Sequence, residues 1–112
     1  MITVRLEVDR RGRLRGVDAY GHAGLGAPGG DPACAAVTGL LRTTARLLAG
    51  DRRYVVSGRA EEPGRLTFTV ATKGVTGKGR LRTVADFLFQ GVRDVARDYP
   101  GAVTVEETVG GE

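Results

Sequence analysis

Residues 20–41 read YGHAGLGAPGGDPACAAVTGLL, and the interpretation of the whole chain depends on this stretch. It holds the only histidine, His22, and the only cysteine, Cys34. Residues 23–30 contain one proline and four glycines, a composition typical of a loop; the glycines are Gly24, Gly26, Gly29 and Gly30. Asp31 and Pro32 are residue types preferred at the N-cap and at the first position of a helix. The stretch therefore predicts a strand end, a glycine-rich loop that could close over a substrate, and a helix start.

The segments on either side of this stretch predict a hairpin and a helix. Residues 2–8 alternate apolar and polar side chains, as a half-buried strand does, and residues 13–22 form the returning strand of a hairpin. The alternation slips at Gly16, which predicts a β-bulge, and the register then places Asp18, Tyr20 and His22 on one face. The helix that starts at Asp31 is expected to end at residues 50–51. It is apolar around much of its circumference, so it should be largely buried.

The second half of the chain predicts two more strands, a second helix and a last strand. Residues 54–60 and 65–71 are the expected strands, joined by a turn at 61–64, and 76–79 is a loop. The second helix is expected from about Arg80 to Tyr99. Phe87 and Phe89 flank its apolar stripe, where they would either form a dimer contact or pack at the edges of the sheet. A short strand at 102–106 follows. The order ββαββαβ predicts an α+β domain with two helices on one face of a mainly antiparallel sheet. Residues 1–107 form a single domain in this interpretation, and 108–112 a frayed tail.

Composition and charge are those of a small single-domain protein. No run of about 18 apolar residues occurs, so neither a membrane span nor a membrane partner is expected. One cysteine cannot form an internal disulfide, which favours a reducing, cytoplasmic setting. The net charge of +4 and the cluster Arg10, Arg11, Arg13 and Arg15 would suit a nucleic-acid partner. A solvated basic turn explains the same cluster, so direct RNA binding stays open.

The glycine loop also satisfies the G-x-G-x-x-G pattern of dinucleotide-binding proteins, between Gly24 and Gly29. Three features argue against that interpretation. Asp31 would place a negative charge where the pyrophosphate should bind at the helix start. Gly29 lies before the helix, so it cannot provide close packing between helix and strand. The pattern is also too short and too antiparallel for a Rossmann unit.

His22 and Cys34 together predict nucleophilic chemistry. A lone cysteine in an apolar helix is more often a buried small hydrophobe. Cys34, however, falls in the first helical turn, where unpaired amides and the positive end of the helix dipole attract a negatively charged sulfur. The same amides could donate to an oxyanion. A histidine and a cysteine at the two ends of one loop are the base and nucleophile that a cysteine hydrolase needs.

The motif around these two residues resembles the signature of the ribosomal-processing cysteine proteases, the Prp (YsxB-like) family. The resemblance rests on Gly21-His22-Ala23, on Gly29 and Asp31, and on Cys34-Ala35-Ala36-Val37-Thr38. It implies that Cys34 is the nucleophile and His22 the general base and acid, with Gly21, Asp31 and Thr38 as supporting positions. It also implies the substrate, a precursor of ribosomal protein L27 that loses an N-terminal extension, and a homodimeric, cytoplasmic enzyme without metal or cofactor.

Two departures and two alternatives accompany the resemblance. Thr38 stands where the family commonly has serine, and Pro32-Ala33 replaces a bulkier apolar pair. Asp31 could orient His22 as the third member of a triad, although an N-cap carboxylate is already engaged with amides, which favours a dyad. One alternative function is a non-catalytic ribosome- or RNA-associated domain that uses the basic turn at residues 10–15. The other is an enzyme fold that has kept the motif but lost the substrate.

Overall fold

A computed structural model describes residues 1–21, 31–59 and 65–110 of the chain. Its seven elements follow the order β1 (Ile2–Val8), β2 (Leu14–Gly21), α1 (Pro32–Ala49), β3 (Tyr54–Arg59), β4 (Arg65–Thr72), α2 (Lys78–Asp98) and β5 (Val103–Val109). The predicted ββαββαβ order and the α+β class are confirmed. No helix in these ranges is long and apolar enough to cross a membrane.

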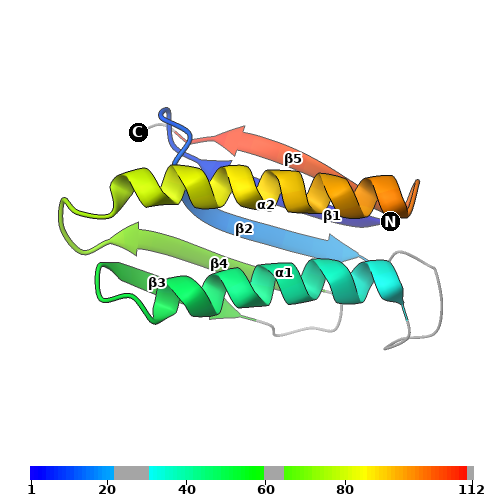
Figure 1. Ribbon diagram of the computed structural model, residues 1–112, viewed down its shortest axis with the longest axis horizontal. Coiled ribbons are helices and arrows are strands. Elements are labelled where there is room, and N and C mark those ends of the chain that lie inside the picture. Colours follow the sequence, from blue (N-terminus) through cyan, green and yellow to red (C-terminus); the bar gives the residue numbers. More distant parts are fainter. Residues whose placement is uncertain (22–30, 60–64, 111–112) are drawn as a thin grey trace.

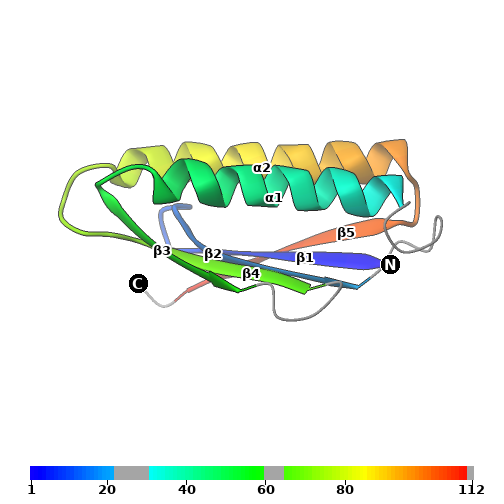
Figure 2. The ribbon, with the colours of Figure 1, turned by 90° about the horizontal axis from the view of Figure 1, so that it is seen from below.

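The strands form one five-stranded sheet in the order β3-β4-β2-β1-β5. The β1–β2, β2–β4 and β3–β4 pairs are antiparallel, whereas β1 and β5 are parallel. Both helices lie on the same face of the sheet, side by side, and the other face is left open (Figures 1 and 2). The sheet is therefore mainly antiparallel and covered on one side, as predicted.

The hairpin of β1 and β2 contains the predicted bulge. Glu7 pairs with Gly16 but the next residue, Val8, pairs with Leu14, so Arg15 is the extra residue on β2. Beyond the bulge, Ala19 is buried under the helices, while Asp18 and Tyr20 occupy alternate positions on the open face. The shared face predicted for Asp18 and Tyr20 is confirmed. His22, predicted to continue it, lies outside the described residues.

The core lies between the helices and the covered face of the sheet. Its fully buried large side chains come from both layers: Val4, Leu6, Leu14, Leu41, Leu48, Leu88 and Val92. Both helices bury one stripe of side chains against the sheet. The expectation that α1 is largely buried was wrong, because its buried residues form a single stripe and Leu47 on its outer side is 53% exposed. The helices also approach each other, because the side chain of Leu40 lies over Gly91, where a Cβ atom would be 2.7 Å from Leu40 Cδ2.

Within the described residues, the structure differs from the predicted boundaries by more than one residue at two places. Helix α2 begins at Lys78 rather than Arg80, directly after Gly77, whose φ of 87° ends the preceding loop. Strand β5 ends at Val109 rather than Glu106, so Thr108 and Val109, expected in the frayed tail, belong to the sheet. Their partners are Glu7 and Val8 of β1. This pairing joins residues about a hundred positions apart, and no local pattern reveals it.

The two flanking phenylalanines of α2 have different environments. Phe89 is partly buried and packs against the core, with the Arg93 guanidinium 5.5 Å from its ring centre. Phe87 is 60% exposed. Packing at the sheet's edge, one of the two predicted alternatives, therefore holds for Phe89 and not for Phe87. The loop at 23–30, the turn at 61–64 and residues 111–112 lie outside the described residues.

Candidate active site

Cys34 lies in the first turn of α1, whose start is capped as predicted. Asp31 has an extended backbone, and its Oδ1 accepts a hydrogen bond from the Cys34 amide at 3.0 Å. The Asp31 carbonyl accepts from the Ala35 amide, also at 3.0 Å. Asp31 is only 9% exposed. The cap thus fixes both the direction of the helix and the position of the cysteine.

This cap limits the amides that could bind an oxyanion. Pro32 has no N–H, and the amides of Cys34 and Ala35 donate to Asp31. Among the amides of residues 32–35, only that of Ala33 has an N–H for which the described residues provide no acceptor. The predicted set of free helix amides is therefore smaller than the first-turn position of Cys34 suggested.

A pocket of about 180 Å³ opens beside Cys34 at one end of the sheet. It lies where β2 ends and α1 begins, with the start of β4 as a further wall (Figure 1). Its floor is apolar and its rim carries two arginines; the lining residues are Ile2, Ala19, Tyr20, Gly21, Cys34, Val37, Thr38, Leu41, Arg42, Arg65 and Leu66. Cys34 itself is partly buried and packs against the core. Cys34 therefore lies at the edge of the core and also lines the pocket.

Gly21 is the last residue of β2 and occupies a conformation that disfavours any side chain. Its φ is 103°, and a Cβ atom at this position would overlap the carbonyl oxygen of Met1. Gly21 pairs with Ile2 across the hairpin, so the close approach follows from the strand pairing. The glycine in the motif thus has a structural reason: it lets β2 end against β1 immediately before His22.

Thr38 lies one helical turn after Cys34 and lines the same pocket. Cys34 and Thr38 therefore face the same pocket from successive turns of α1. Two more residues of the pocket, Arg42 and Arg65, were not predicted. Arg42 follows Thr38 at the same helical spacing, which is a usable signal, whereas Arg65 reaches the pocket only because β4 pairs with β2.

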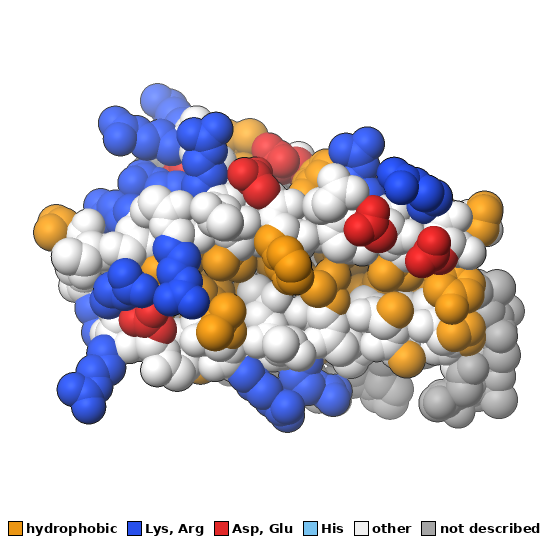
Figure 3. Space-filling view, in the orientation of Figure 1, with side chains coloured by type: hydrophobic (Ala, Val, Ile, Leu, Met, Phe, Trp, Pro, Cys, Tyr) orange, Lys and Arg blue, Asp and Glu red, His pale blue; other side chains and the backbone are white. Residues whose placement is uncertain are grey.

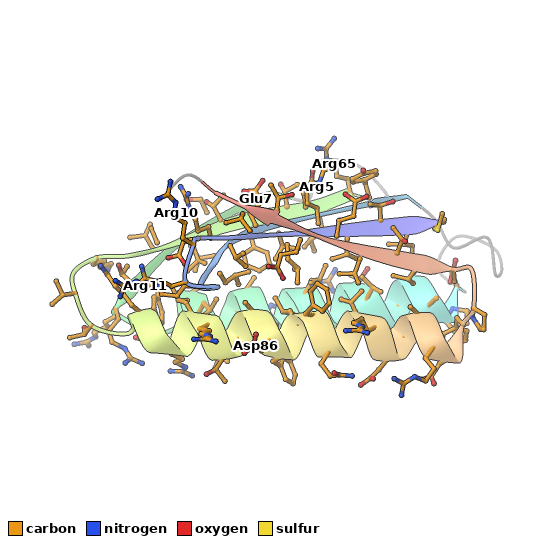
Figure 4. The ribbon with its side chains drawn as sticks, turned by 90° about the horizontal axis from the view of Figure 1, so that it is seen from above. Arg5, Glu7, Arg10, Arg11, Arg65 and Asp86 are labelled. Carbon is orange, nitrogen blue, oxygen red and sulfur yellow. The ribbon has the colours of Figure 1, made fainter. Side chains whose placement is uncertain are left out.

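Arg65 links the pocket to the open face of the sheet. Its guanidinium is 3.2 Å from the Asp18 carboxylate and 5.9 Å from the centre of the Tyr20 ring. Figure 4 shows Arg65 on the side of the sheet away from the helices. Tyr20 is 37% exposed, and both Tyr20 and Arg65 line the pocket, although the Arg65 side chain lies on the open face of the sheet.

Several predicted site residues lie outside the described residues, namely His22, Gly24, Gly26, Gly29 and Gly30. Their roles in catalysis and in the loop stay predictions. Within the described ranges, no three His, Cys, Asp or Glu side chains come close enough together to hold a metal ion. The chemistry that the described part supports is that of a single cysteine at a capped helix start beside an apolar pocket.

Comparison with known proteins identifies the class. The family model of the cysteine protease Prp matches residues 1–104. The chain resembles the ribosomal processing protease Prp from S. aureus in complex with a covalently linked product peptide. That match has a TM-score of 0.80 at 17% identity and covers 96% of this chain and 100% of that one. The same S. aureus protease with a substrate peptide gives a TM-score of 0.76, with the same identity and coverage. SMU.848 from Streptococcus mutans gives 0.73 at 26% identity, over 98% of this chain and 96% of that one. Among curated proteins, no sequence matches the chain.

The family match and the fold are those of a cysteine peptidase. The match over residues 1–104 of 112 shows that the chain belongs to the Prp family of cysteine proteases. The resemblance inferred from residues 21–38 is confirmed, and the interpretation as a domain without catalytic function is not supported by the family match.

Proposed function

We propose that this protein is a cytoplasmic endopeptidase that removes an N-terminal extension from ribosomal protein L27 during assembly of the large ribosomal subunit. The observation that carries the proposal is the position of Cys34, at a capped helix start beside an apolar pocket in a Prp-family chain. The S. aureus relative, a ribosomal processing protease, has been captured with a substrate peptide and with a covalently linked product peptide. A ribosomal substrate for this chain is consistent with both complexes.

In the proposed mechanism, Cys34 is the nucleophile and His22 the general base and acid. His22 accepts the Sγ proton, and Sγ bonds to the scissile carbonyl carbon, whose oxygen takes the negative charge. The C–N bond then breaks as His22 returns the proton to the leaving amine, which leaves a thioester. His22 next accepts a proton from water, and the hydroxide attacks the thioester carbon. The C–S bond breaks, the sulfur regains its proton, and the carboxylate product leaves.

Ala33 is the proposed helix donor to the oxyanion, because its amide is the one that the cap leaves without an acceptor among the described residues. Asp31 is proposed mainly to shape the helix start, so that the catalytic group is a dyad. The apolar floor of the pocket, formed by Ile2, Val37 and Leu41, suits an aliphatic or aromatic substrate side chain next to the scissile bond.

The experiment that tests the nucleophile is cleavage of an L27-type peptide with an N-terminal extension. Cys34→Ala should abolish cleavage while thermal unfolding stays close to that of the wild type. Thr43→Ala, an exposed position on the same helix, is the matched control and should cleave normally. Cleavage by Cys34→Ala at the wild-type rate would show that another group is the nucleophile.

Two substitutions separate the structural and catalytic roles of Asp31. Asn is about as good an N-cap as Asp, whereas Ala costs about 1 kcal/mol of stability. For a dyad, Asp31→Asn should retain most of the activity and the stability, and Asp31→Ala should lower the stability. A loss of about 10⁴-fold in kcat in Asp31→Asn, as when a triad carboxylate becomes an amide, would establish a triad instead.

The homodimer expected for the family has a candidate surface on the outer face of the two helices. Leu47 is 53% and Phe87 60% exposed. Leu47 lies two turns from Leu40 on α1, and Phe87 one turn from Gly91 on α2, so both flank the seam where the helices touch. Figure 3 shows hydrophobic side chains gathered along this seam.

Sedimentation of charge variants tests this surface. Phe87→Glu should convert the proposed dimer to a monomer. Val55→Glu is the control, because Val55 is similarly exposed, at 49%, but belongs to β3. A wild-type monomer at high protein concentration, or a dimer that survives Phe87→Glu, would exclude the seam as the interface.

A further inference from the structure

Positive charge is concentrated at the end of the molecule opposite Cys34. This end comprises the β1–β2 turn, the connection from α1 to β3, the connection from β4 to α2, and the first turns of α2 (Figure 1). Figure 3 shows lysine and arginine side chains crowded over it. Ten of the 17 lysines and arginines belong to these segments or to the adjoining start of β2: Arg10, Arg11, Arg13, Arg15, Arg52, Arg53, Lys73, Lys78, Arg80 and Arg82.

Most of these cations are not neutralised within the described part of the chain. Asp9 binds Arg13 at 2.6 Å, and Asp51 binds Arg53 at 2.7 Å and Arg80 at 3.1 Å. The hydrogen bond from the Arg53 side chain is the main reason why the pKa of Asp51 lies well below its ordinary value. The other seven have no carboxylate oxygen within 4.0 Å among the described residues; they are Arg10, Arg11, Arg15, Arg52, Lys73, Lys78 and Arg82.

Two grooves meet at the β1–β2 turn and are edged by these cations. One, of about 610 Å³, is lined by Arg10, Arg11 and Arg82. The other, of about 280 Å³, is lined by Arg13, Arg15 and Lys78. Arg82 packs against the turn itself, because a Cβ atom on Gly12 would lie 3.9 Å from its Cγ and Nε. The turn and the start of α2 therefore present their cations together.

Carboxylates limit this surface to the end of the molecule. Three carboxylates also line the larger groove: Asp9 at the turn, which is paired with Arg13, and Asp86 and Glu107 farther along. Figure 4 shows Arg10 and Arg11 at the turn and Asp86 farther along α2. A polyanion would thus meet arginines at the turn and be repelled farther along the groove.

The first turn of α2 carries positive charges that destabilise this end of the helix. Lys78 and Arg80 lie in its first turn, where the helix dipole is positive, and the turn itself has no acidic residue and no side-chain cap. Asp51 pairs with Arg80, but Lys78 has no carboxylate partner among the described residues. Arg82 follows in the next turn. Cations at this end of a helix disfavour it locally, and natural sequences break such rules mainly at functional sites. A bound anion would relieve this repulsion and could also use the amides of the helix start.

These side chains suit an oxyanion such as phosphate. Eight of the ten cations are arginines, whose planar guanidinium binds phosphate oxygens through two parallel hydrogen bonds. Exposed apolar side chains near this end are Val75, Val109 and Val55, on three separate segments, and they do not form the continuous apolar face of a membrane-binding helix.

We propose that the basic end, from the β1–β2 turn to the first turns of α2, binds the phosphate backbone of RNA. The choice of RNA as the polyanion rests on the proposed function, because the proposed substrate is part of a particle made largely of RNA. From Cys34 to its last residue, Ala49, α1 spans about 23 Å at 1.5 Å per residue. A peptidase held by this end would present its active site about that far from the RNA surface, toward a protein chain projecting from it.

The test measures binding of the full chain to a fluorescein-labelled RNA duplex of about 16 base pairs, the span of one double-stranded-RNA-binding domain. The variant is Arg11→Gln with Arg82→Gln, which removes two exposed cations from two different segments. The matched control is Arg93→Gln with Arg97→Gln, two exposed arginines near the other end of α2.

Each neutralised phosphate contributes about −0.9 to the slope of log K against log salt, a value measured for duplex DNA. Losing two contacts should make the slope shallower by about 1.8. If the variant and the wild type bind equally at 1 M salt, this difference in slope makes the variant bind about 30-fold more weakly at 0.15 M salt. The control should bind as the wild type does, and both variants should cleave a short L27-type peptide at the wild-type rate.

If the Arg11/Arg82 variant and the Arg93/Arg97 control lost RNA affinity equally, the proposal would be overturned, because RNA binding would then depend on net charge alone. Binding of poly-glutamate as tightly as RNA would point to an acidic protein, and tighter binding to vesicles with anionic lipid would point to a membrane; either result rejects RNA. If the wild type binds RNA at this end but cleaves no L27-type peptide, the proposed function fails and the RNA site stands.

Discussion

Replacement of Gly21 by alanine isolates the backbone geometry next to the active site. Gly21 has a φ of 103°, and a Cβ atom would overlap the Met1 carbonyl oxygen. That carbonyl cannot move away freely, because the next amide, of Ile2, donates to Ala102 at 2.8 Å. Two costs therefore add: about 1 to 3 kcal/mol for a side chain in a sparsely populated backbone region, and about 1 to 3 kcal/mol for the steric overlap.

Two other glycines separate these costs. Gly101 has a φ of 81° with nothing within 4 Å of a new Cβ atom, so Gly101→Ala should show only the backbone cost. Gly39 lies in α1 with equally open surroundings, so Gly39→Ala should stabilise the protein by about 0.5 to 1 kcal/mol through helix propensity. Gly21→Ala should therefore lose about 4 kcal/mol, roughly 2 kcal/mol more than Gly101→Ala.

Thermal and urea unfolding of the three variants measure these differences. At about 4 °C per kcal/mol for a chain of this size, Tm should fall by about 16 °C in Gly21→Ala and by about 8 °C in Gly101→Ala, and rise slightly in Gly39→Ala. Peptide cleavage should fall in Gly21→Ala alone, because residue 22 follows directly. If Gly21→Ala were no less stable than Gly101→Ala, the close approach of β2 to Met1 would not exist as described.

Three further predictions concern stability. The pKa of Asp51 is held below its ordinary value mainly by the Arg53 side chain. The ionised carboxylate therefore stabilises the fold fully above about pH 4, and this stabilisation is lost as pH falls through the lowered pKa. Asp51→Asn should flatten the fall of Tm below pH 4, and an unchanged profile would show that the Asp51–Arg53 pair does not contribute to the pH dependence of stability. The buried Tyr54 hydroxyl donates to the Gly77 carbonyl at 2.6 Å, so Tyr54→Phe should cost about 1 kcal/mol in urea unfolding, and a neutral result would mean that water replaces the bond. Leu88 is fully buried in α2, so Leu88→Ala should cost about 2 to 5 kcal/mol, and a cost below 1 kcal/mol would contradict the packed core.

The elements of the fold could be predicted because each depends on neighbouring residues. The alternation of apolar and polar residues predicted β1 and β2, and its slip at Gly16 predicted the bulge. Asp31-Pro32 predicted the start of α1, including its N-cap. The prediction ended β5 too early, at Glu106, since its last residues are polar or exposed. Val109 stays in the sheet through its parallel partner Val8, which no local pattern contains.

The predicted site residues that the structure describes are close together in sequence: Gly21, Asp31, Cys34 and Thr38. Cys34 and Thr38 are one helical turn apart, so their common pocket follows from helix geometry. Arg65 lines the same pocket because β4 pairs with β2. The sequence predicted the cap but not which amide it occupies: the Asp31 side chain accepts from the Cys34 N–H. Of the amides of residues 32–35, this leaves that of Ala33 as the candidate oxyanion donor.

By itself, the sequence determined the α+β class, the helix start at Asp31, the family and the candidate pair His22 and Cys34, because these depend on residue type and on spacing within a few turns. Only the tertiary structure decided that β5 lies parallel to β1, that Gly21 abuts Met1, and that arginines from the β1–β2 turn and from α2 share one end of the molecule. Such contacts join residues tens of positions apart. They arise when the helices and strands pack around a common core, and that packing depends on the whole chain at once.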